Sequence, residues 1–555
     1  MKVLLFDFGY CYTPHMETEA EIVQRHLDRG DHVLRLSCRG ELPICTFNPT
    51  HSLPKCAECL SRRQAVKRLI RPRVLEKSVL CLTAEDRRAV AGFRFCGQRL
   101  AELKQLKFGD FDLGLAVASV MVDATRDPDP DLNFHRTDVH DWIGVTLAAY
   151  LSARNILVAE KPDRVYVMNG RWCYTRAVLR ACQACGVECC CHERGGDRDR
   201  YLLATNRLPH EIAGTTESIE ESWCQADPVD RESVGAAFFE GKAKGVERQW
   251  FSFVADQQRG RLPEDWSGAR RNVAVFMTSE FEFAAIGSEY TYRFYKDQND
   301  ALGRIIAGLE SRNSSIHLNI RVHPNMKGVR NANIDWVLAL RSPKATVIAP
   351  QSAVSSYALL HACEKVLTFG STMGIEAAYW GKPSILGGPG VYQNLGATYN
   401  PSTHDELMEM LLNDLPPKLR DGALKFGYHE LRKGLRHVYY EAETPFRGRF
   451  KGRDYEADSP WVFRAIMRLA RALRWRFTRL SQWHRQRARR RLGVTAQGTP
   501  ALGNTGVSWP SALDAVQHNL PKMRGCKEIP EVATLSSRFI EAAANGRLRL
   551  PVQDH

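Results

Sequence analysis

Residues 362–386, ACEKVLTFGSTMGIEAAYWGKPSIL, decide the fold because they predict a strand, a tight turn, a helix and a second strand. The first strand ends at Gly370, where the backbone can turn sharply. Ser371 and Thr372 follow at the start of a helix, whose free N–H groups favour an anion. Glu376 lies one turn further along. The pattern is typical of a phosphate-binding βαβ unit, although a capped α/β connection without a ligand has the same sequence.

Two earlier strands carry polar side chains to the same predicted edge. The strand 316–322 contains Arg321 and leads directly into His323. The strand 272–277 leads into Ser279, Glu280 and Glu282. Ligands of open α/β sheets bind outside the carboxyl ends of the strands, so these residues are predicted to face one ligand. Each of them taken alone could equally be a solvated loop residue.

The N-terminal half shows its own alternating pattern, with strands at 3–6 and 32–36 around a helix at 16–27. It lacks a GxGxxG fingerprint, so no dinucleotide is expected there. Further on, a strand at 163–168 opens onto Asn169 and Arg171, and a strand at 188–191 leads into Glu193 and Arg194. We expect these four side chains to point into a cleft between two domains. The alternative is that Arg171 and Arg194 are ordinary surface cations.

The segments TSEFEF, RVHPN and FGSTMGIEAAYWGKPSI, in that order, resemble bacterial capsule polysaccharide biosynthesis glycosyltransferases and are similar to capsule Kdo-transferase-like proteins. The NGR and HERG segments of the N-terminal half also resemble elements of that family. The resemblance implies an α/β, GT-B-like fold of two facing Rossmann-like domains with a basic helical C-terminal extension. It also implies that the N-terminal domain faces the acceptor, while the HP dipeptide and the later Ser/Thr turn hold the donor's nucleotide phosphate.

Length and composition agree with two domains, because 555 residues with 44% hydrophobic content can bury large cores. We expect an acceptor-side domain over 1–240 and a nucleotide-sugar domain over 241–440, then a basic segment over 441–492 and a tail of no assigned role over 493–555. No apolar run approaches the roughly 20 residues that span a bilayer, and the opening strand is too short for a signal peptide. A cytoplasmic protein is therefore predicted.

Four of the 16 cysteines are spaced as candidate metal ligands in the Cys-rich loop 38–59. Cys56 and Cys59 suit two positions of a tetrahedral zinc, and Cys38 and Cys45 would complete the set. We expect a structural zinc there and no cofactor for catalysis. Four free thiols are the alternative, and an iron–sulfur cluster is a third reading. The later cysteines at 182–191 alternate in direction and are interpreted as core residues.

The segment 464–491 contains 11 Arg and no Asp or Glu, and so supplies most of the formal net charge of +14. Apolar residues recur at three- and four-residue steps, with tryptophans beside them: Val462, Ile466, Leu469, Leu473, Phe477, Leu480, Trp461, Trp475 and Trp483. Such a helix suits the anionic inner face of the cytoplasmic membrane, to which we expect the protein to bind peripherally. The alternative is that the stripe packs on the protein itself. No nucleic-acid-binding signature accompanies the Arg run, so nucleic acid is not expected as a partner.

Together these features predict metal-independent transfer of a sugar from a nucleotide-activated donor to a lipid-linked or polysaccharide acceptor. His323, Arg321 and the Ser371–Thr372 turn would stabilise the departing phosphate, and Glu376 would bind the ribose. Glu193, Glu280 and Glu282 are the candidate bases, and the sequence does not choose among them. Capsule assembly and export machinery is the expected protein partner.

Two other functions fit the same architecture. A nucleotide-sugar 2-epimerase would also place His and Ser residues around a diphosphate. The basic segment argues against it, because a soluble sugar nucleotide gives an enzyme no reason to bind a membrane. A non-catalytic subunit of capsule polysaccharide assembly or export is the third reading.

Overall fold

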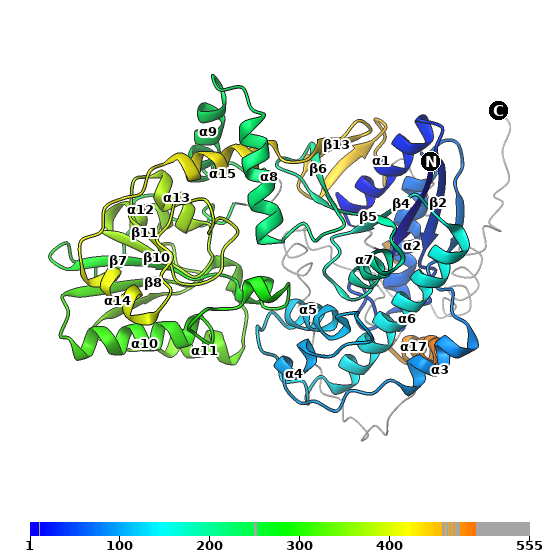
Figure 1. The fold of residues 1–555 in the computed structure, drawn as a ribbon, viewed down its shortest axis with the longest axis horizontal. Coiled ribbons are helices and arrows are strands. Elements are labelled where there is room, and N and C mark those ends of the chain that lie inside the picture. The colour runs from blue at the N-terminus through cyan, green and yellow to red at the C-terminus, as the bar shows by residue number, and fades with distance from the viewer. Residues whose placement is uncertain are drawn as a thin grey trace.

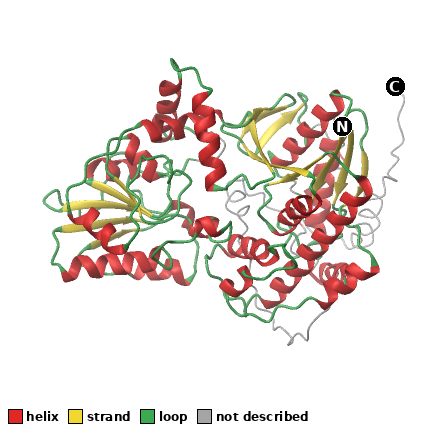
Figure 2. Cartoon of the chain, viewed as in Figure 1, coloured by secondary structure: helices red, strands yellow, loops and turns green. Residues whose placement is uncertain are grey.

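The computed structural model describes residues 1–9, 12–248, 252–457 and 478–494, with a few single residues between the last two ranges. The described chain forms two α/β units that lie side by side, each built on its own sheet (Figure 1). Figure 2 shows that helices flank the strands of both sheets. The predicted α/β class with two Rossmann-like domains is therefore confirmed. The tail 495–555 and most of the predicted apolar stripe, including Val462, Ile466, Leu473, Trp475 and Phe477, lie outside the described residues.

The N-terminal unit contains a seven-stranded sheet in the order β12-β6-β5-β4-β1-β2-β3. Its strands are β1 (Lys2–Asp7), β2 (His32–Ser37), β3 (Leu75–Ser78), β4 (Arg164–Met168), β5 (Glu188–Arg194), β6 (Arg200–Thr205) and β12 (Leu435–Arg436). Strands β1 to β5 are parallel, whereas β6 runs antiparallel to both of its neighbours, β5 and β12. The expected strands near residues 3, 32, 163 and 188 are thus confirmed.

Alternation along β1 shows how this sheet is covered on both faces. Leu4 and Phe6 join the core formed with α5 (Leu113–Thr125), α6 (Arg136–Glu160) and α7 (Cys173–Cys185). Val3 and Leu5 point the other way, into a core shared with α1 (His15–Asp28) and α2 (Leu53–Lys67). A strand buried on both faces reads as a continuous apolar run, which is the pattern of MKVLLF at the start of the chain. The helices α3 (Ala84–Gly92) and α4 (Leu100–Lys104) complete this unit.

The C-terminal unit contains a five-stranded, fully parallel sheet in the order β11-β10-β7-β8-β9. Its strands are β7 (Arg271–Phe276), β8 (Ile316–Arg321), β9 (Ala345–Ile348), β10 (Lys365–Thr368) and β11 (Ser384–Leu386). One face packs on α10 (Gln298–Ser311), α11 (Ala332–Ala339) and α14 (His404–Leu412), and the other on α12 (Ser356–Ala362) and α13 (Met373–Tyr379). The opening segment 362–386 therefore forms β10, the turn, α13 and β11 as predicted.

Both sheets are doubly wound, because the first strand of each lies in the middle and the chain crosses to either side of it. The orders are β3-β2-β1-β4-β5 and β9-β8-β7-β10-β11. In such sheets a ligand crevice opens where the strand order reverses. The crevice lies between the ends of β1 and β4 in one unit, and between the ends of β7 and β10 in the other. These four loops position the candidate site.

The boundary expected at residue 240 does not match the packing. Helices α8 (Ile212–Cys224) and α9 (Arg231–Ala243) pack against α13 and α15 (Asp421–Arg432), in a core that includes Ile219, Phe239 and Phe426. The N-terminal unit thus ends near β6, at residue 205. After α15 the chain returns to that unit through β12 and the hairpin of β13 (Tyr440–Thr444) and β14 (Arg447–Phe450). Sequence periodicity does not report which sheet a connecting helix packs on.

Helix α6 is the most apolar long helix of the described chain. Its 25 residues satisfy a length and hydropathy test for spanning a membrane, but 78% of its most apolar window is buried inside the protein. Trp142, Leu147 and Ala153 are among its fully buried side chains. We therefore interpret α6 as a core helix, which the sequence analysis did not recognise as an apolar segment of this length.

The described part of the basic segment packs on the protein itself. Helix α17 (Thr478–Leu492) contacts α2, α3 and α6. Arg485 and Arg489 form ion pairs of 2.7 and 2.8 Å with Asp141 of α6, whose side chain is fully buried. Leu492 is also buried. For these residues the structure shows packing on the protein itself, which was the alternative to membrane binding. The reason is that the buried carboxylate of Asp141 requires cationic partners.

We predict that the double substitution Arg485→Ala and Arg489→Ala destabilises the N-terminal unit by about 3–5 kcal/mol near neutral pH, because it leaves Asp141 buried without an opposite charge. Urea unfolding measures the loss. The matched control is Arg487→Ala with Arg490→Ala, which removes two exposed arginines of the same helix and should change stability by about 0.5 kcal/mol or less. Equal losses in the two double variants would contradict the role of the Asp141 ion pairs.

Candidate active site

The ends of β7 and β8 bring a serine, a histidine and an asparagine together. Ser279 Oγ lies 3.1 Å from Nδ1 of His323, and the backbone N–H of Asn325 donates to the same nitrogen at 3.1 Å. An amide N–H can only donate, so Nδ1 is the acceptor and the neutral ring carries its hydrogen on Nε2. The side-chain amide of Asn325 donates to Glu282 at 2.8 Å. The polar residues predicted after β7 and β8 therefore do meet.

His323 is neutral at physiological pH. Burial, together with the nearby cations Lys242, Arg321 and Arg126, lowers its pKa to about 4. A neutral imidazole with its hydrogen on Nε2 can donate a hydrogen bond to a phosphate oxygen. The ring is held edge-to-face against Phe253, with 5.2 Å between the ring centroids. His323 is thus fixed as a hydrogen-bond donor rather than as a proton carrier.

The turn after β10 is fixed by its own hydrogen bonds. Gly370 has φ of +117°, and a Cβ there would lie 2.4 Å from the carbonyl oxygen of Pro389, so only glycine fits. The Ser371 N–H donates to Thr368 Oγ1 at 3.0 Å, and the Met373 N–H donates to Ser371 Oγ at 3.3 Å. The turn predicted from FGST is therefore present, in front of the seven-residue helix α13.

Lys242 is the residue on this side of the cleft that the sequence analysis missed. Its ammonium group donates to Thr372 Oγ1 at 3.0 Å and to Glu376 at 2.8 Å. Glu376 is 1% exposed and also accepts hydrogen bonds from Thr372 and from the hydroxyl of Tyr357. The predicted ribose ligand Glu376 is thus occupied in holding Lys242 beside the turn. Lys242 ends α9, more than a hundred residues from the motif, and no local pattern marks it.

Arg321 does not point at the turn. Its guanidinium donates to the carbonyl oxygens of Ala349 and Ser352 at 3.0 and 3.1 Å, and the residue is 2% exposed. Burial lowers its pKa to about 10, which leaves it charged. Arg321 therefore braces the loop after β9 and acts on His323 only through its charge, which corrects the expectation that it contacts the ligand.

Glu193 lies at the end of β5 between two histidines. The side-chain amide of Asn169 donates to Glu193 at 2.6 Å and lies 2.9 Å from Nε2 of His210. His15 and His210 lie 3.8 and 3.9 Å from the carboxylate. Burial lowers the pKa of both histidines to about 4. Burial would raise the pKa of Glu193, but these neighbours, the Arg194 N–H and the Asn169 amide lower it to about 2.

Arg171 joins the two switch points. It follows β4 of the N-terminal unit, yet its guanidinium donates to the carbonyl oxygen of Glu282 in the C-terminal unit at 2.7 Å. The same group lies 3.9 Å from Asp123. Nearby, Arg126 donates to the side-chain oxygen of Asn325 at 2.9 Å. Arg171 therefore lies between the two units, and Arg126 is a second cation there that the sequence did not indicate.

The two carboxyls after β7 differ from Glu193 in their ionisation. Burial, together with the charge of Asp297, raises the pKa of Glu280 to about 7. Burial also raises the pKa of Glu282 to about 7, against the opposing charge of Arg171. A general base works best when its pKa lies near the working pH. The structure thus separates the three candidate bases into one that is ionised at low pH and two that titrate near neutrality.

Arg194 faces away from the cleft. Its guanidinium donates to the carbonyl oxygens of Pro445 and Thr13 at 3.2 and 3.1 Å and lies over the ring of Phe446. It therefore ties the β13–β14 hairpin to the start of α1, which corrects the expectation that it binds a ligand.

Cys56 and Cys59 lie on α2, one turn apart, rather than in a loop. Burial raises the pKa of Cys38 to about 11 and that of Cys56 to about 12, and neighbouring thiols of this group contribute. Among the described residues no group of three or more His, Cys, Asp or Glu side chains is arranged to hold a metal ion. The structural zinc stays a prediction, which metal analysis of the reduced protein tests. Cys182, Cys189, Cys190 and Cys191 are buried, as expected for core residues, whereas Cys185 of the same group is only half-buried.

Residues 288–418 match the family model of capsule polysaccharide biosynthesis proteins. The match includes His323, the Gly370 turn and Glu376, and it begins just after Glu282. It confirms the resemblance to that family over the part of the chain that contains the RVHPN and FGST motifs of the C-terminal unit. No curated protein sequence matches the chain.

Several solved structures share the general architecture at low similarity. KpsC from Thermosulfurimonas dismutans, described as a beta Kdo 2,4 transferase, is 12% identical with a TM-score of 0.33, over 49% of this chain and 80% of that chain. The glycosyltransferase SnogD from Streptomyces nogalater is 12% identical with a TM-score of 0.23, over 78% and 96%. UDP-GlcNAc 2-epimerase from Neisseria meningitidis is 13% identical with a TM-score of 0.20, over 78% and 99%.

Proposed function

We propose that the protein is a glycosyltransferase of capsule polysaccharide assembly, which moves a sugar from a nucleotide-activated donor to a capsular glycan or its lipid-linked precursor. The observation that carries this proposal is the contact between the two switch points, where Arg171 of one unit donates to the carbonyl oxygen of Glu282 of the other. Ligands of doubly wound sheets bind at such points. The family match over 288–418 supports the capsule context.

In the proposed reaction an acceptor hydroxyl oxygen attacks the anomeric carbon of the donor sugar. The bond from that carbon to the phosphate oxygen breaks, and the nucleotide leaves with the electron pair. A base takes the hydroxyl proton. Negative charge grows on the departing phosphate, so preorganised donors at that place lower the barrier.

The phosphate side of the reaction is assigned to Lys242, His323 and the Ser371 turn. Lys242 supplies a positive charge beside Thr372, and the neutral ring of His323 supplies a hydrogen-bond donor. We propose that these groups stabilise the leaving phosphate without a divalent metal. Activity that persists in excess chelator supports this part, and activity lost in chelator and restored by magnesium contradicts it.

We assign the general base to Glu282. Its pKa of about 7 suits proton transfer near neutral pH, and its carboxyl lies beside Asn325 between the two switch points. Glu193 is ionised far below neutrality and is held by four polar neighbours, so it is better suited to orienting the acceptor. Glu280 has a similar pKa to Glu282 but belongs to a group with Tyr292 and Asp297.

We further propose that the protein binds peripherally at the inner face of the cytoplasmic membrane, where a lipid-linked acceptor and capsule export machinery would meet it. Helix α17 packs through Arg485 and Arg489, so the interfacial role falls to its outer face. That outer face consists of Arg479, Trp483, Arg487, Arg490 and Arg491, all exposed, and the Arg487 guanidinium lies 5.6 Å from the centre of the Trp483 ring. An aromatic ring among arginines is typical of a surface that contacts anionic head groups.

His323→Ala and Ser371→Ala should each raise the activation free energy of transfer by about 2.7–4 kcal/mol, because each removes one group positioned for the leaving phosphate. The measurement is acceptor-dependent nucleotide release, together with mass analysis of the glycosylated acceptor. Arg321→Met serves as the contrast, since its guanidinium contacts only loop carbonyls in this structure and its loss should lower stability more than chemistry.

The same assay separates the alternative functions. Nucleotide released only with acceptor indicates transfer, and a changed sugar still attached to its nucleotide indicates an epimerase. Near-native turnover of both His323→Ala and Ser371→Ala would overturn the site, whichever reaction is found.

The acceptor-dependent kcat/KM should rise with pH through an apparent pKa of about 7, because Glu282 must be deprotonated to act as a base. Arg171 favours the ionised form of Glu282, so Arg171→Met should move this limb to higher pH. Arg194→Met is the control, because Arg194 is not among the charges that act on Glu282. The apparent pKa in the pH profile of this variant should equal that of wild type. If kcat/KM rose through the same apparent pKa in wild type and in Arg171→Met, Glu282 would not be the base.

The triple substitution Arg479→Gln, Arg487→Gln and Arg490→Gln should weaken binding to phosphatidylglycerol-containing vesicles by roughly a hundredfold, at about 1 kcal/mol per cation. Vesicle sedimentation at low and high salt measures this, and wild-type binding should fall as salt screens the charges. The variant keeps Arg485 and Arg489, so α17 stays packed. Equal partitioning of variant and wild type would remove the outer face of α17 from the membrane proposal.

A further inference from the structure

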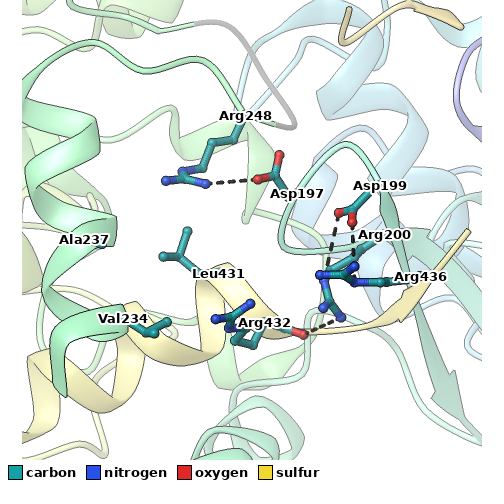
Figure 3. A pocket seen from close by; sticks show the side chains of 9 residues that line it. All are labelled: Asp197, Asp199, Arg200, Val234, Ala237, Arg248, Leu431, Arg432 and Arg436. Atoms are coloured by element: carbon teal, nitrogen blue, oxygen red, sulfur yellow. Dashed lines mark hydrogen bonds and ion pairs between the residues drawn. The ribbon is translucent and has the colours of Figure 1, made fainter. Parts of the chain in front are cut away.

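A cavity of about 250 Å³ lies apart from the site described above, where α15 leads into β12 (Figure 3). One wall belongs to the N-terminal sheet and its turn before β6, with Asp199, Arg200 and Arg436. The other wall belongs to α9, to the end of α15 and to Arg248. The cavity thus sits between the two units, at the point where the chain returns from one to the other.

The cavity is cationic. Four arginines line it, against two aspartates, which leaves an excess of two positive charges. Figure 3 shows the charged heads of Arg248, Arg432, Arg200 and Arg436 around the open space above Leu431. Charges of one sign gathered in a concave surface raise the local concentration of oppositely charged ligands.

The two aspartates neutralise these arginines only in part. Asp197 accepts a close hydrogen bond from Arg248 at 3.0 Å. Asp199, by contrast, lies 3.6 Å from Arg436 and 3.9 Å from Arg200, and its side chain is 54% exposed. Within the part of the chain that the structure describes, the guanidinium of Arg432 forms no ion pair, and only its backbone carbonyl is used, by Arg200 at 3.1 Å. Arg432 and Arg436 are therefore available to an incoming anion.

The floor of the cavity is apolar. Val234 and Ala237, one turn apart on α9, and Leu431 of α15 provide it. An inorganic phosphate ion has no apolar atoms to pack on this surface, whereas a sugar ring has C–H groups that do. The volume lies below the roughly 300–1,000 Å³ of pockets for drug-sized ligands, which suits one sugar residue. Guanidinium groups bind carboxylate and phosphate in the same forked geometry.

The cavity is connected to the proposed transfer site by α9. Val234 lines the cavity and Lys242 touches the Thr372 turn, eight residues further along the same helix, or about 12 Å at 1.5 Å per residue. Arg248 also approaches this helix, since its Nη2 would lie 3.5 Å from a Cβ on Gly241. A glycan with one residue in the cavity could therefore extend toward the transfer site.

We infer that this cavity is a binding site for an anionic sugar residue, a carboxylated or phosphorylated unit of the acceptor glycan that lies a short distance from the acceptor hydroxyl. The glycan as acceptor rests on the proposed function; the anion-binding property of the cavity does not. Arg432 and Arg436 bind the anionic substituent, and the apolar floor packs against the ring.

The test is calorimetric titration of the full chain with trigalacturonate, with its methyl ester and with glucose 1-phosphate. Wild type should bind at least one of the anionic probes and bind the neutral ester at least tenfold more weakly. Arg432→Gln with Arg436→Gln should weaken anionic binding at least tenfold. Asp199→Asn should tighten it, because it removes the competing carboxylate, and a merely structural role would not predict this gain. Arg88→Gln, an exposed arginine of α3, controls for net charge and should bind as wild type does.

A carboxylate source is indicated if trigalacturonate is the tighter probe, and a phosphate source if glucose 1-phosphate is. The inference is overturned if no anionic probe binds more tightly than the neutral ester, or if the double variant and Arg88→Gln lose affinity equally. Acceptor-dependent nucleotide release, measured in parallel, keeps the two proposals apart. Charge-selective binding without nucleotide release refutes the transfer reaction and leaves the anionic-sugar site standing. Nucleotide release with binding that does not depend on charge refutes the anionic-sugar site alone.

Discussion

The hydrogen bond from Arg171 to the carbonyl oxygen of Glu282 is the contact on which the rest of the site depends. It joins the loop after β4 of one doubly wound sheet to the loop after β7 of the other at 2.7 Å. Arg126 and Asn325 add a second contact between the units nearby. Because ligands of doubly wound sheets bind at the switch points, holding these two loops together places the two expected ligand positions next to each other.

Burial and neighbouring polar groups set the electrostatics around this contact. Burial raises the pKa of Glu282 to about 7 against the charge of Arg171, while polar neighbours lower that of Glu193 to about 2. Burial and three cations keep His323 neutral. Carboxyls whose environments push their pKa values apart commonly take different roles in one reaction. One polar network therefore contains a carboxyl that titrates near neutrality, a carboxylate that stays ionised down to low pH and a neutral imidazole.

Much of the fold could be predicted from the sequence, because the strands are buried on both faces and read as apolar runs that end at polar loops. The Gly370 turn, the contact of Ser279 with His323 and the position of Arg171 follow from such local patterns. The side chains that were placed wrongly are long ones: Arg194 and Arg321 follow the right strands, but their guanidinium groups reach backbone carbonyls instead of the cleft. The sequence shows where a long side chain starts on a strand, but it does not show which group the end of that side chain contacts.

Residues brought in from distant elements were missed for the same reason. Lys242 comes from α9, whose packing on α13 and α15 depends on the tertiary fold, and Asp141 binds α17 from the second turn of the apolar helix α6. The charge run of the basic segment looked uniform, yet within α17 Arg485 and Arg489 pair with the buried Asp141 while Arg487 is exposed. Only a partner on the other element distinguishes Arg485 from Arg487.

Hydrogen exchange with and without CMP, UDP and GDP tests the central claim most directly, namely that the nucleotide donor lies between the two switch points. With the nucleotide that binds, the account predicts slower exchange in peptides from both units: residues around 169–172 after β4 on one side, and around 279–282, 323–326 and 370–373 on the other. Protection confined to the five-stranded unit, or absent with all three nucleotides, would contradict it.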